Sequence, residues 1–313
     1  MRSDSRIYVA GHNGLVGAAL CRQLTTEGYT NLIVRDRIDL DLCNQAAVEA
    51  FFKETKPEYV FLAAAVVGGI HANDSKPVEF LRDNLLIQTN IIDAAYKNGV
   101  KKLAFLGSTC IYPRDCPQPI KEEYLLTGPL EETNQWYAIA KIAGIKLCQA
   151  YRKQYGFNAI SLMPTNLYGP GDNFDLMNSH VLPALIRRFH EGKINNADAV
   201  EVWGSGKPFR EFLYIEDMAE ACCFLMQHYD DESIVNIGMG EDISIKALAE
   251  LIKDIVGFQG EINFNATKPD GTPKKVTDVT KLNSLGWQSK TSLHRGIEMT
   301  YAWYLNNLPK ELV

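Results

Sequence analysis

The sequence predicts an α/β fold in which a doubly wound parallel sheet carries a smaller, interleaved C-terminal lobe. Two observations lead to this prediction. Short β-rich runs alternate with helical patterns through the first half of the chain, and this regularity ends after Pro164. Alternating strands and helices are typical of a parallel sheet covered on both faces, because parallel neighbours need a crossover connection.

The expected strands of the sheet are short and apolar, as is typical of strands buried on both faces. They are Arg6–Ala10, Asn31–Val34, Tyr59–Ala65, Lys102–Leu106 and Ala159–Met163. Apolar residues at three- and four-residue spacing predict helices between these strands. The helices cover Leu15–Thr26, Gln45–Glu54, Pro77–Lys97 and Trp136–Tyr155.

The second half contains turn-forming segments rich in Gly, Pro, Asn and Asp, with strands expected at Phe212–Tyr214, Val235–Ile237 and Glu261–Phe264. We expect residues 1–165 to form the sheet domain, with segments at about 210–240 returning to it. Residues 166–313 are expected to form mainly the second lobe.

Composition excludes several classes of function. The net charge is 32 − 38 = −6 and the chain has no basic tract, so we expect no nucleic-acid partner. The longest apolar run, Val60–Val67, is far shorter than the ~20 residues that span a membrane, and no signal peptide is recognisable. The seven cysteines are scattered without a C-x-x-C motif, which favours a reducing, cytoplasmic location and no metal site.

A glycine-rich loop follows the first expected strand. Gly11, Gly14 and Gly17 form a G-x-x-G-x-x-G pattern that leads directly into a helix. Such glycines allow a tight turn and close approach to a pyrophosphate, while the helix start offers free N–H groups. A glycine-rich turn without a ligand is the alternative, but the place at the first strand of an alternating pattern favours a dinucleotide and a Rossmann-type domain.

A tyrosine and a lysine share one face of an expected helix. Tyr137 and Lys141 are four residues apart, so the phenol and the ammonium point to the same place. A phenol has a pKa of ~10, and a nearby ammonium favours its ionised form. Ser108 follows the strand Lys102–Leu106, at the edge where open α/β sheets bind ligands. A Tyr–Lys pair on a solvated helix is the alternative interpretation.

At these residues the chain resembles the extended short-chain dehydrogenase/reductases, and among them the GDP-L-fucose synthase family. The resemblance covers nearly the whole chain. Its motifs are AGHNGLVG (10–17), LAAAVVGGI (62–70), GSTCIYP (107–113), YAIAKIAG (137–144), MPTNLYGPGDNF (163–174), SHVLPALIRRFH (179–190), VWGSGKPFREF (202–212) and KPDGTPKK (268–275). It implies a homodimer, commonly formed through helices such as those around Pro77–Lys97 and Trp136–Tyr155.

The resemblance implies the chemistry of conversion of GDP-4-dehydro-6-deoxy-D-mannose to GDP-L-fucose. C3 and C5 of the 4-keto sugar are epimerised, with Cys110 and His180 exchanging protons on opposite faces. NADPH then reduces the C4 ketone, with Tyr137 as proton donor and Lys141 beside it. Ser108 and Tyr137 stabilise the enolate oxygen by hydrogen bonding.

The family pattern also implies the binding residues. For the GDP-sugar they are Arg188, Arg210, Trp203 and Asp278. The residues implied for NADP are Gly11, His12, Asn13, Gly14, Leu15, Val16, Gly17, Arg37, Asp41, Leu42, Leu106, Gly107, Ser108, Thr109, Lys141, Pro164, Thr165, Asn166, Leu167 and His180.

Two positions depart from the family pattern. Many members have arginine where this chain has Asn13, and Asp36 lies between Arg35 and Arg37. An acid at this point usually binds the ribose hydroxyls of NAD, whereas arginine accommodates the 2′-phosphate of NADP. NADH therefore remains the alternative cofactor.

Other functions remain open at this stage. One is another nucleotide-sugar enzyme of the family, a 4-epimerase or a 4,6-dehydratase. A dehydratase typically has an Asp-Glu pair where this chain has Thr109-Cys110. The other is a non-catalytic dinucleotide-binding protein, because a fold alone does not define an activity.

Overall fold

The computed structural model describes residues 1–176, 179–268 and 270–307. Its centre is a six-stranded sheet in which every neighbouring pair is parallel. The strand order is β10 (Val235–Ile237), β5 (Ala159–Pro164), β4 (Lys102–Leu106), β3 (Tyr59–Leu62), β1 (Ile7–Ala10) and β2 (Leu32–Ile33). The order reverses between β1 and β3, so the loop after β1 lies at the switch point of a Rossmann-type sheet. The predicted fold class is confirmed.

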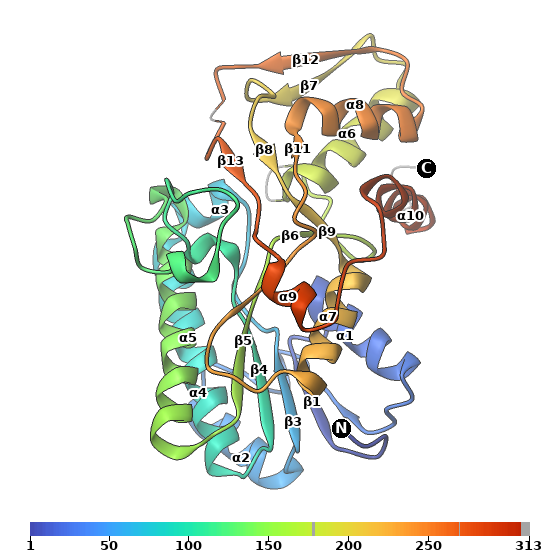
Figure 1. Ribbon diagram of the computed structural model, residues 1–313. Coiled ribbons are helices and arrows are strands. Elements are labelled where there is room, and N and C mark those ends of the chain that lie inside the picture. Colours follow the sequence, from blue (N-terminus) through green and yellow to red (C-terminus); the bar gives the residue numbers. More distant parts are fainter. Residues whose placement is uncertain (177–178, 269, 308–313) are drawn as a thin grey trace.

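Helices cover both faces of this sheet (Figure 1). The helices α2 (Gln45–Thr55), α4 (Asn84–Lys97) and α5 (Gln135–Tyr155) pack on one face, and α1 (Leu15–Thr26), α7 (Ile215–His228) and α9 (Thr280–Ser284) pack on the other. Successive strand residues point to opposite faces, and in β3 Val60 and Leu62 contact the first layer whereas Phe61 contacts the second. Burial on both faces explains why these strands are mostly apolar.

The smaller lobe has its own apolar core around α6 (Val181–Ile194), α8 (Ile245–Val256) and α10 (Leu293–Asn306). Its strands are β7 (Ala199–Trp203) paired with β12 (Glu261–Asn265), and β8 (Phe209–Arg210) between β11 (Ile243–Ser244) and β13 (Lys274–Lys275). The parallel pair β6 (Asn166–Tyr168) and β9 (Phe212–Tyr214) lies between the two lobes (Figure 1). The chain therefore passes between the lobes several times, and a domain boundary near residue 165 stays a prediction.

Two expected elements differ from the structure. The strand expected at 59–65 ends at Leu62, where its partner β1 ends, and Val66 N instead donates to the Asn84 side chain (2.8 Å). The helix expected at 77–97 is helical from Pro77, but it contains a π-helical turn at Glu79–Asp83 before α4. The Asn84 amide donates to the Phe80 carbonyl (2.7 Å), and such insertion into the helical ladder is a recognised cause of irregular turns.

Short helices complete the fold. These are α3 (Ile70–Ser75) and three 3₁₀ turns at Thr109–Ile111, Glu122–Tyr124 and Glu132–Asn134. Within the described ranges, no helix has both the length and the apolar character needed to cross a membrane.

Candidate active site

The glycine loop is shaped by two glycines that no other residue can replace. Gly11 has φ +86°, and a Cβ there would lie 2.7 Å from the backbone of Ala64 after β3. A Cβ on Gly17 would lie 2.1 Å from the Gly11 carbonyl oxygen, because α1 packs directly on the loop. The helix begins at Leu15, so its first N–H groups face the end of β1.

The far end of the loop meets the segment after β2. Asp36 accepts a hydrogen bond from the Asn13 amide (2.5 Å) and lies 3.4 Å from His12 Nε2. Arg35 and Arg37 are both exposed, and the Arg35 guanidinium lies over the ring of Phe51 at 5.4 Å. The acid is therefore drawn toward the loop, and both arginines are accessible to a phosphate.

Two further predicted cofactor residues follow in the next turn. Asp41 uses one carboxylate oxygen to accept a hydrogen bond from Cys43 N (3.0 Å), and Leu42 is half-buried. The Leu42 carbonyl accepts from Asn90 of α4 (2.9 Å). The Asn90 contact therefore holds this turn against α4.

The carboxyl ends of β4 and β5 supply the next group of predicted residues. Leu106 ends β4, with Gly107, Ser108 and Thr109 directly after it, and Pro164 ends β5. Thr165 is buried, and its hydroxyl is one of the buried polar atoms that lack a hydrogen-bond partner among the described residues. Asn166 and Leu167 follow in β6. A ligand at this edge would meet an unsatisfied hydroxyl.

Tyr137 and Lys141 lie beside the end of β4, as their spacing predicts. Lys141 is 3% exposed, donates to the Leu106 carbonyl (2.7 Å), and its ammonium lies 5.6 Å from the centre of the Tyr137 ring. Burial lowers the pKa of Lys141 to about 8. The ammonium was expected to lower the pKa of the Tyr137 phenol. Burial has the larger effect and raises this pKa. The phenol is held in its protonated form.

Cys110 lies in the 3₁₀ turn after β4, next to this pair. Its N–H donates to Ser108 Oγ (3.3 Å), and its thiol is buried. Burial raises the pKa of the thiol, while the positive charges of Lys275 and Lys141 and the Ser108 hydrogen bond act in the opposite direction. Lys275 therefore faces the same site, although we did not predict it.

His180 is the residue that precedes the first turn of α6. The residue is exposed, yet the surrounding protein lowers the pKa of its imidazole through partial desolvation. The imidazole is therefore neutral at physiological pH. Residues 177–178, just before it, lie outside the described part of the chain.

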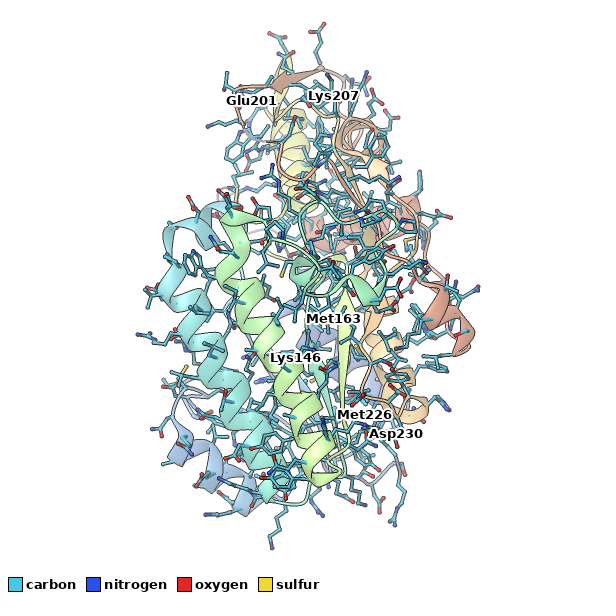
Figure 2. All side chains as sticks on the ribbon, turned by 60° about the vertical axis from the view of Figure 1, so that its left-hand side comes forward. Lys146, Met163, Glu201, Lys207, Met226 and Asp230 are labelled. Atoms are coloured by element: carbon cyan, nitrogen blue, oxygen red, sulfur yellow. The ribbon has the colours of Figure 1, made fainter. Side chains whose placement is uncertain are left out.

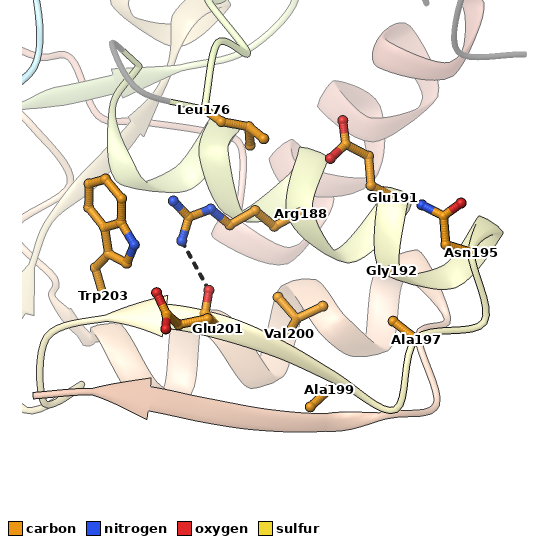
Figure 3. A pocket seen from close by; sticks show the side chains of 10 residues that line it. All are labelled: Leu176, Arg188, Glu191, Gly192, Asn195, Ala197, Ala199, Val200, Glu201 and Trp203. Carbon is orange, nitrogen blue, oxygen red and sulfur yellow. Dashed lines mark hydrogen bonds between the residues drawn. The ribbon is translucent and has the colours of Figure 1, made fainter.

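Arg188 and Trp203 form one wall of a pocket of about 420 Å³ in the smaller lobe (Figure 3). The Arg188 guanidinium lies 4.7 Å from the centre of the Trp203 ring and donates to the Glu201 carbonyl (3.0 Å). The Lys268 ammonium also approaches this ring, at 5.0 Å. Two cations beside an exposed aromatic face suit a ligand that combines an aromatic ring with negative charge.

Arg210 and Lys275 are direct neighbours on the paired strands β8 and β13. Residues paired in this way project to the same face of a sheet, so the two cations lie together. Arg210 donates to the Asp270 carbonyl (3.3 Å), and the Asp270 carboxylate accepts from Ser205 N (2.6 Å) and Ser205 Oγ (2.7 Å). The pairing places two positive charges on one face of this small sheet.

Asp278 makes a different set of contacts. Its carboxylate accepts from Thr280 N (2.8 Å) at the start of α9, and its carbonyl accepts from Asn236 of β10 (3.3 Å). Asp278 therefore lies in the segment that leads from β13 to α9, and this segment is held against β10. The residue whose backbone carbonyl accepts from Arg210 is Asp270, which lies in the KPDGTPKK motif.

Comparison with known proteins agrees with this geometry. The family model described as the NAD dependent epimerase/dehydratase family matches residues 7–238, and the chain belongs to this family. Within it the chain belongs with the GDP-L-fucose synthases, as the motifs predicted. GDP-L-fucose synthase 1 of Arabidopsis thaliana is 60% identical over 305 residues, covering 97% of this chain and 94% of that protein.

Two solved structures are similar over nearly the whole chain. A GDP-6-OMe-4-keto-L-xylo-heptose reductase from C. jejuni has a TM-score of 0.94 at 42% identity and covers 98% of this chain and 99% of that one. A GDP-L-fucose synthetase from Naegleria fowleri bound to NADP has a TM-score of 0.90 at 32% identity, covering 98% and 96%.

Proposed function

We propose that this chain converts GDP-4-dehydro-6-deoxy-D-mannose to GDP-L-fucose by epimerisation at C3 and C5 and NADPH-dependent reduction at C4. The observation that carries the proposal is the grouping of Tyr137, Lys141, Ser108 and Cys110 at the carboxyl end of β4, between the glycine loop and the cationic pair of the smaller lobe. The GDP-L-fucose synthases at 60% identity support the same substrate.

The residues present fit a nicotinamide dinucleotide. The loop of Gly11 and Gly17 leaves its backbone open to a pyrophosphate, and Arg37 is exposed where a 2′-phosphate would lie. The unpartnered hydroxyl of Thr165 and the ammonium of Lys141 would hold the nicotinamide end. Bound NADPH supplies the hydride that is transferred to C4 of the sugar.

The epimerisation is carried by Cys110 and His180. The 4-keto group acidifies the C–H bonds at C3 and C5, so removal of a proton gives an enolate, and its return from the other face inverts the carbon. The neutral His180 imidazole can accept a proton and the Cys110 thiol can donate one. Ser108 and the Tyr137 phenol stabilise the enolate oxygen by donating hydrogen bonds.

In the reduction Tyr137 donates its proton to the C4 oxygen. The raised pKa of the phenol keeps this proton in place until the oxygen becomes strongly basic. The charged Lys141, 5.6 Å from the ring, then stabilises the phenolate that remains. In the smaller lobe Arg188 and Arg210 bind the diphosphate, and Trp203 contacts the GDP moiety.

The test is incubation with GDP-4-dehydro-6-deoxy-D-mannose and NADPH, with product stereochemistry read by NMR. We expect GDP-L-fucose and equimolar loss of NADPH. The similarity to a GDP-heptose reductase favours a second candidate, reduction of a GDP-4-keto-heptose. Turnover of the heptose together with failure on the 6-deoxy sugar would contradict the first proposal. NADPH binding without turnover of any GDP-sugar would indicate a non-catalytic protein.

We infer that the enzyme is a homodimer that acts in the cytoplasm. The helices α4 and α5 lie side by side on the outside of the sheet (Figure 2), and they expose Leu86 (39%), Trp136 (36%) and Ile139 (41%). A second copy packed on this face would bury these apolar side chains. The seven cysteines are free thiols, which suits a reducing compartment. Ile139→Glu should shift the mass measured by light scattering toward the monomer.

A further inference from the structure

A buried carboxylate lies directly behind the cationic pair. Glu211 follows Arg210 in the chain and is 0% exposed. Because side chains alternate along an extended chain, Glu211 projects away from the face that carries Arg210. Burial of a carboxylate without hydrogen bonds would be very costly, so its oxygens need donors around them.

All four partners of the Glu211 side chain are donors. One oxygen, Oε1, accepts from Met239 N (2.6 Å) and Gly240 N (2.8 Å) in the loop after β10. The other, Oε2, accepts from Thr277 N (2.8 Å) and Thr277 Oγ1 (2.8 Å) after β13. One carboxylate thus joins the large sheet to both strands that carry the cations.

The backbone of Glu211 adds two more links. Its N–H donates to the Lys275 carbonyl (3.2 Å), and its carbonyl accepts from the Asn166 amide (2.7 Å) in β6. The space around the carboxylate is filled, because a Cβ on Gly238 would lie 2.2 Å from Oε1. The carboxylate has no room to move.

We propose that Glu211 is a positioning residue that holds Arg210 and Lys275 together for the diphosphate of the substrate. The inference rests on the proposed function for the identity of the anion. The two-residue strands β8 and β13 have too few backbone hydrogen bonds to fix their own register. The Glu211 side chain and Thr277 supply the connection they lack.

An amide cannot replace this carboxylate. In Glu211→Gln the NH₂ group would face either two backbone N–H groups at the Oε1 position, or Thr277 N at the Oε2 position. Both arrangements oppose donor to donor, and the second is milder because the Thr277 hydroxyl can turn to accept. We therefore expect the segment at Thr277 to move, and Lys275 with it.

The chain contains a matched control. Asp217 is 5% exposed, and its carboxylate accepts from Lys290 N (2.9 Å), Thr291 N (2.8 Å) and Thr291 Oγ1 (2.8 Å). It joins α7 to a distant segment in the same way, but none of its partners is a ligand-binding residue. Asp217→Asn reports the effect of losing a buried carboxylate alone.

The experiment measures GDP and NADPH binding by calorimetry, well below the melting temperature of each variant. Loss of one charge-assisted contact predicts a Kd for GDP raised roughly tenfold in Glu211→Gln, with the Kd for NADPH unchanged within about twofold. Asp217→Asn should bind both ligands as the wild type does. Unchanged GDP binding in Glu211→Gln, or equal weakening in Asp217→Asn, would overturn the proposal.

A milder variant keeps the test decisive if Glu211→Gln does not fold. Thr277→Val removes only the hydroxyl contact to Oε2. The loss of one hydrogen bond should raise the Kd for GDP by about threefold. Wild-type affinity in Thr277→Val would then overturn the inference. A wild-type protein that binds NADPH but not GDP would instead contradict the proposed function.

Discussion

At the edge of the large sheet, the candidate residues come from the ends of successive strands and the helices that follow them. In the smaller lobe, Arg210, Asp270 and Lys275 come from short strands and loops up to 65 positions apart in sequence, and a buried carboxylate behind them connects the segments. The first arrangement follows from a repeated strand–helix pattern. The second depends on individual side-chain contacts, so it is more sensitive to single substitutions outside the ligand-binding residues.

The largest expected effect is at the sheet edge. Tyr137→Phe removes the proton donor without changing the packing against Phe80, whose ring lies 6.4 Å away. We expect reduction to fall by roughly 10²–10⁴, the range typical of general acid catalysis, with NADPH affinity retained. Single-turnover loss of NADPH absorbance measures the first quantity and calorimetry the second. Near-normal turnover would remove Tyr137 from the chemistry.

Cys110→Ser should separate the two reactions of the same edge. The hydroxyl has nearly the volume of the thiol but barely ionises, so exchange at C3 and C5 should slow by roughly 10² or more. Reduction can continue and would yield a GDP-6-deoxyhexose with unchanged configuration at these carbons. NMR of products formed in heavy water measures deuterium at each position. Normal deuterium incorporation would show that the thiol only packs the core.

The contrast between the regions explains what the sequence could predict. Apolar periodicity predicted Leu15–Thr26 and Lys102–Leu106 with their observed bounds, and Lys141 donates to Leu106 at the end of the strand that Ser108 follows. Two-residue strands such as β13 have no periodicity, so nothing in the sequence places Lys275 beside Arg210. Asp278 was assigned by family pattern alone, its carboxylate accepts from Thr280 N, and its role in binding stays a prediction.

The role of the smaller lobe in binding GDP can be tested by comparing a variant of Arg210 with a variant of Asp278. Arg210→Ala removes charge-assisted hydrogen bonds to a diphosphate and should raise the Kd for GDP by roughly 10- to 100-fold. Asp278→Asn should leave this Kd unchanged, since its carboxylate is engaged by the backbone and the side chain of Thr280. Titration calorimetry with GDP decides both. If Asp278→Asn weakens GDP binding as much as Arg210→Ala does, Asp278 belongs to the binding site.

A smaller effect is expected at the adenosine end of the sheet edge. Arg37→Ala removes the exposed guanidinium but leaves Asp36 bound to Asn13. We expect the Kd for NADPH to rise about tenfold, and the Kd for NADH to change by less than about twofold, because only NADPH has the 2′-phosphate. Equal losses for both cofactors would mean that Arg37 does not contact this phosphate.

Burial of Lys141 should also make the reduction depend on pH. Its lowered pKa of about 8 means that the ammonium is present below this pH and is lost as the pH rises through it. The neutral amine cannot stabilise the phenolate left on Tyr137, so kcat/KM for reduction should fall by about tenfold per pH unit above 8.

Lys141→Arg tests whether deprotonation of Lys141 causes this fall in kcat/KM. Arginine stays charged throughout the accessible range, so the fall near pH 8 should disappear even though the larger guanidinium lowers the absolute rate. The phenol of Tyr137 cannot account for the decline, because burial raises its pKa rather than lowering it. A pH profile measured from 6 to about 10 with saturating NADPH separates the two groups. If the decline near pH 8 persists in Lys141→Arg, another group controls it, and the buried ammonium beside β4 is not what limits the reduction at alkaline pH.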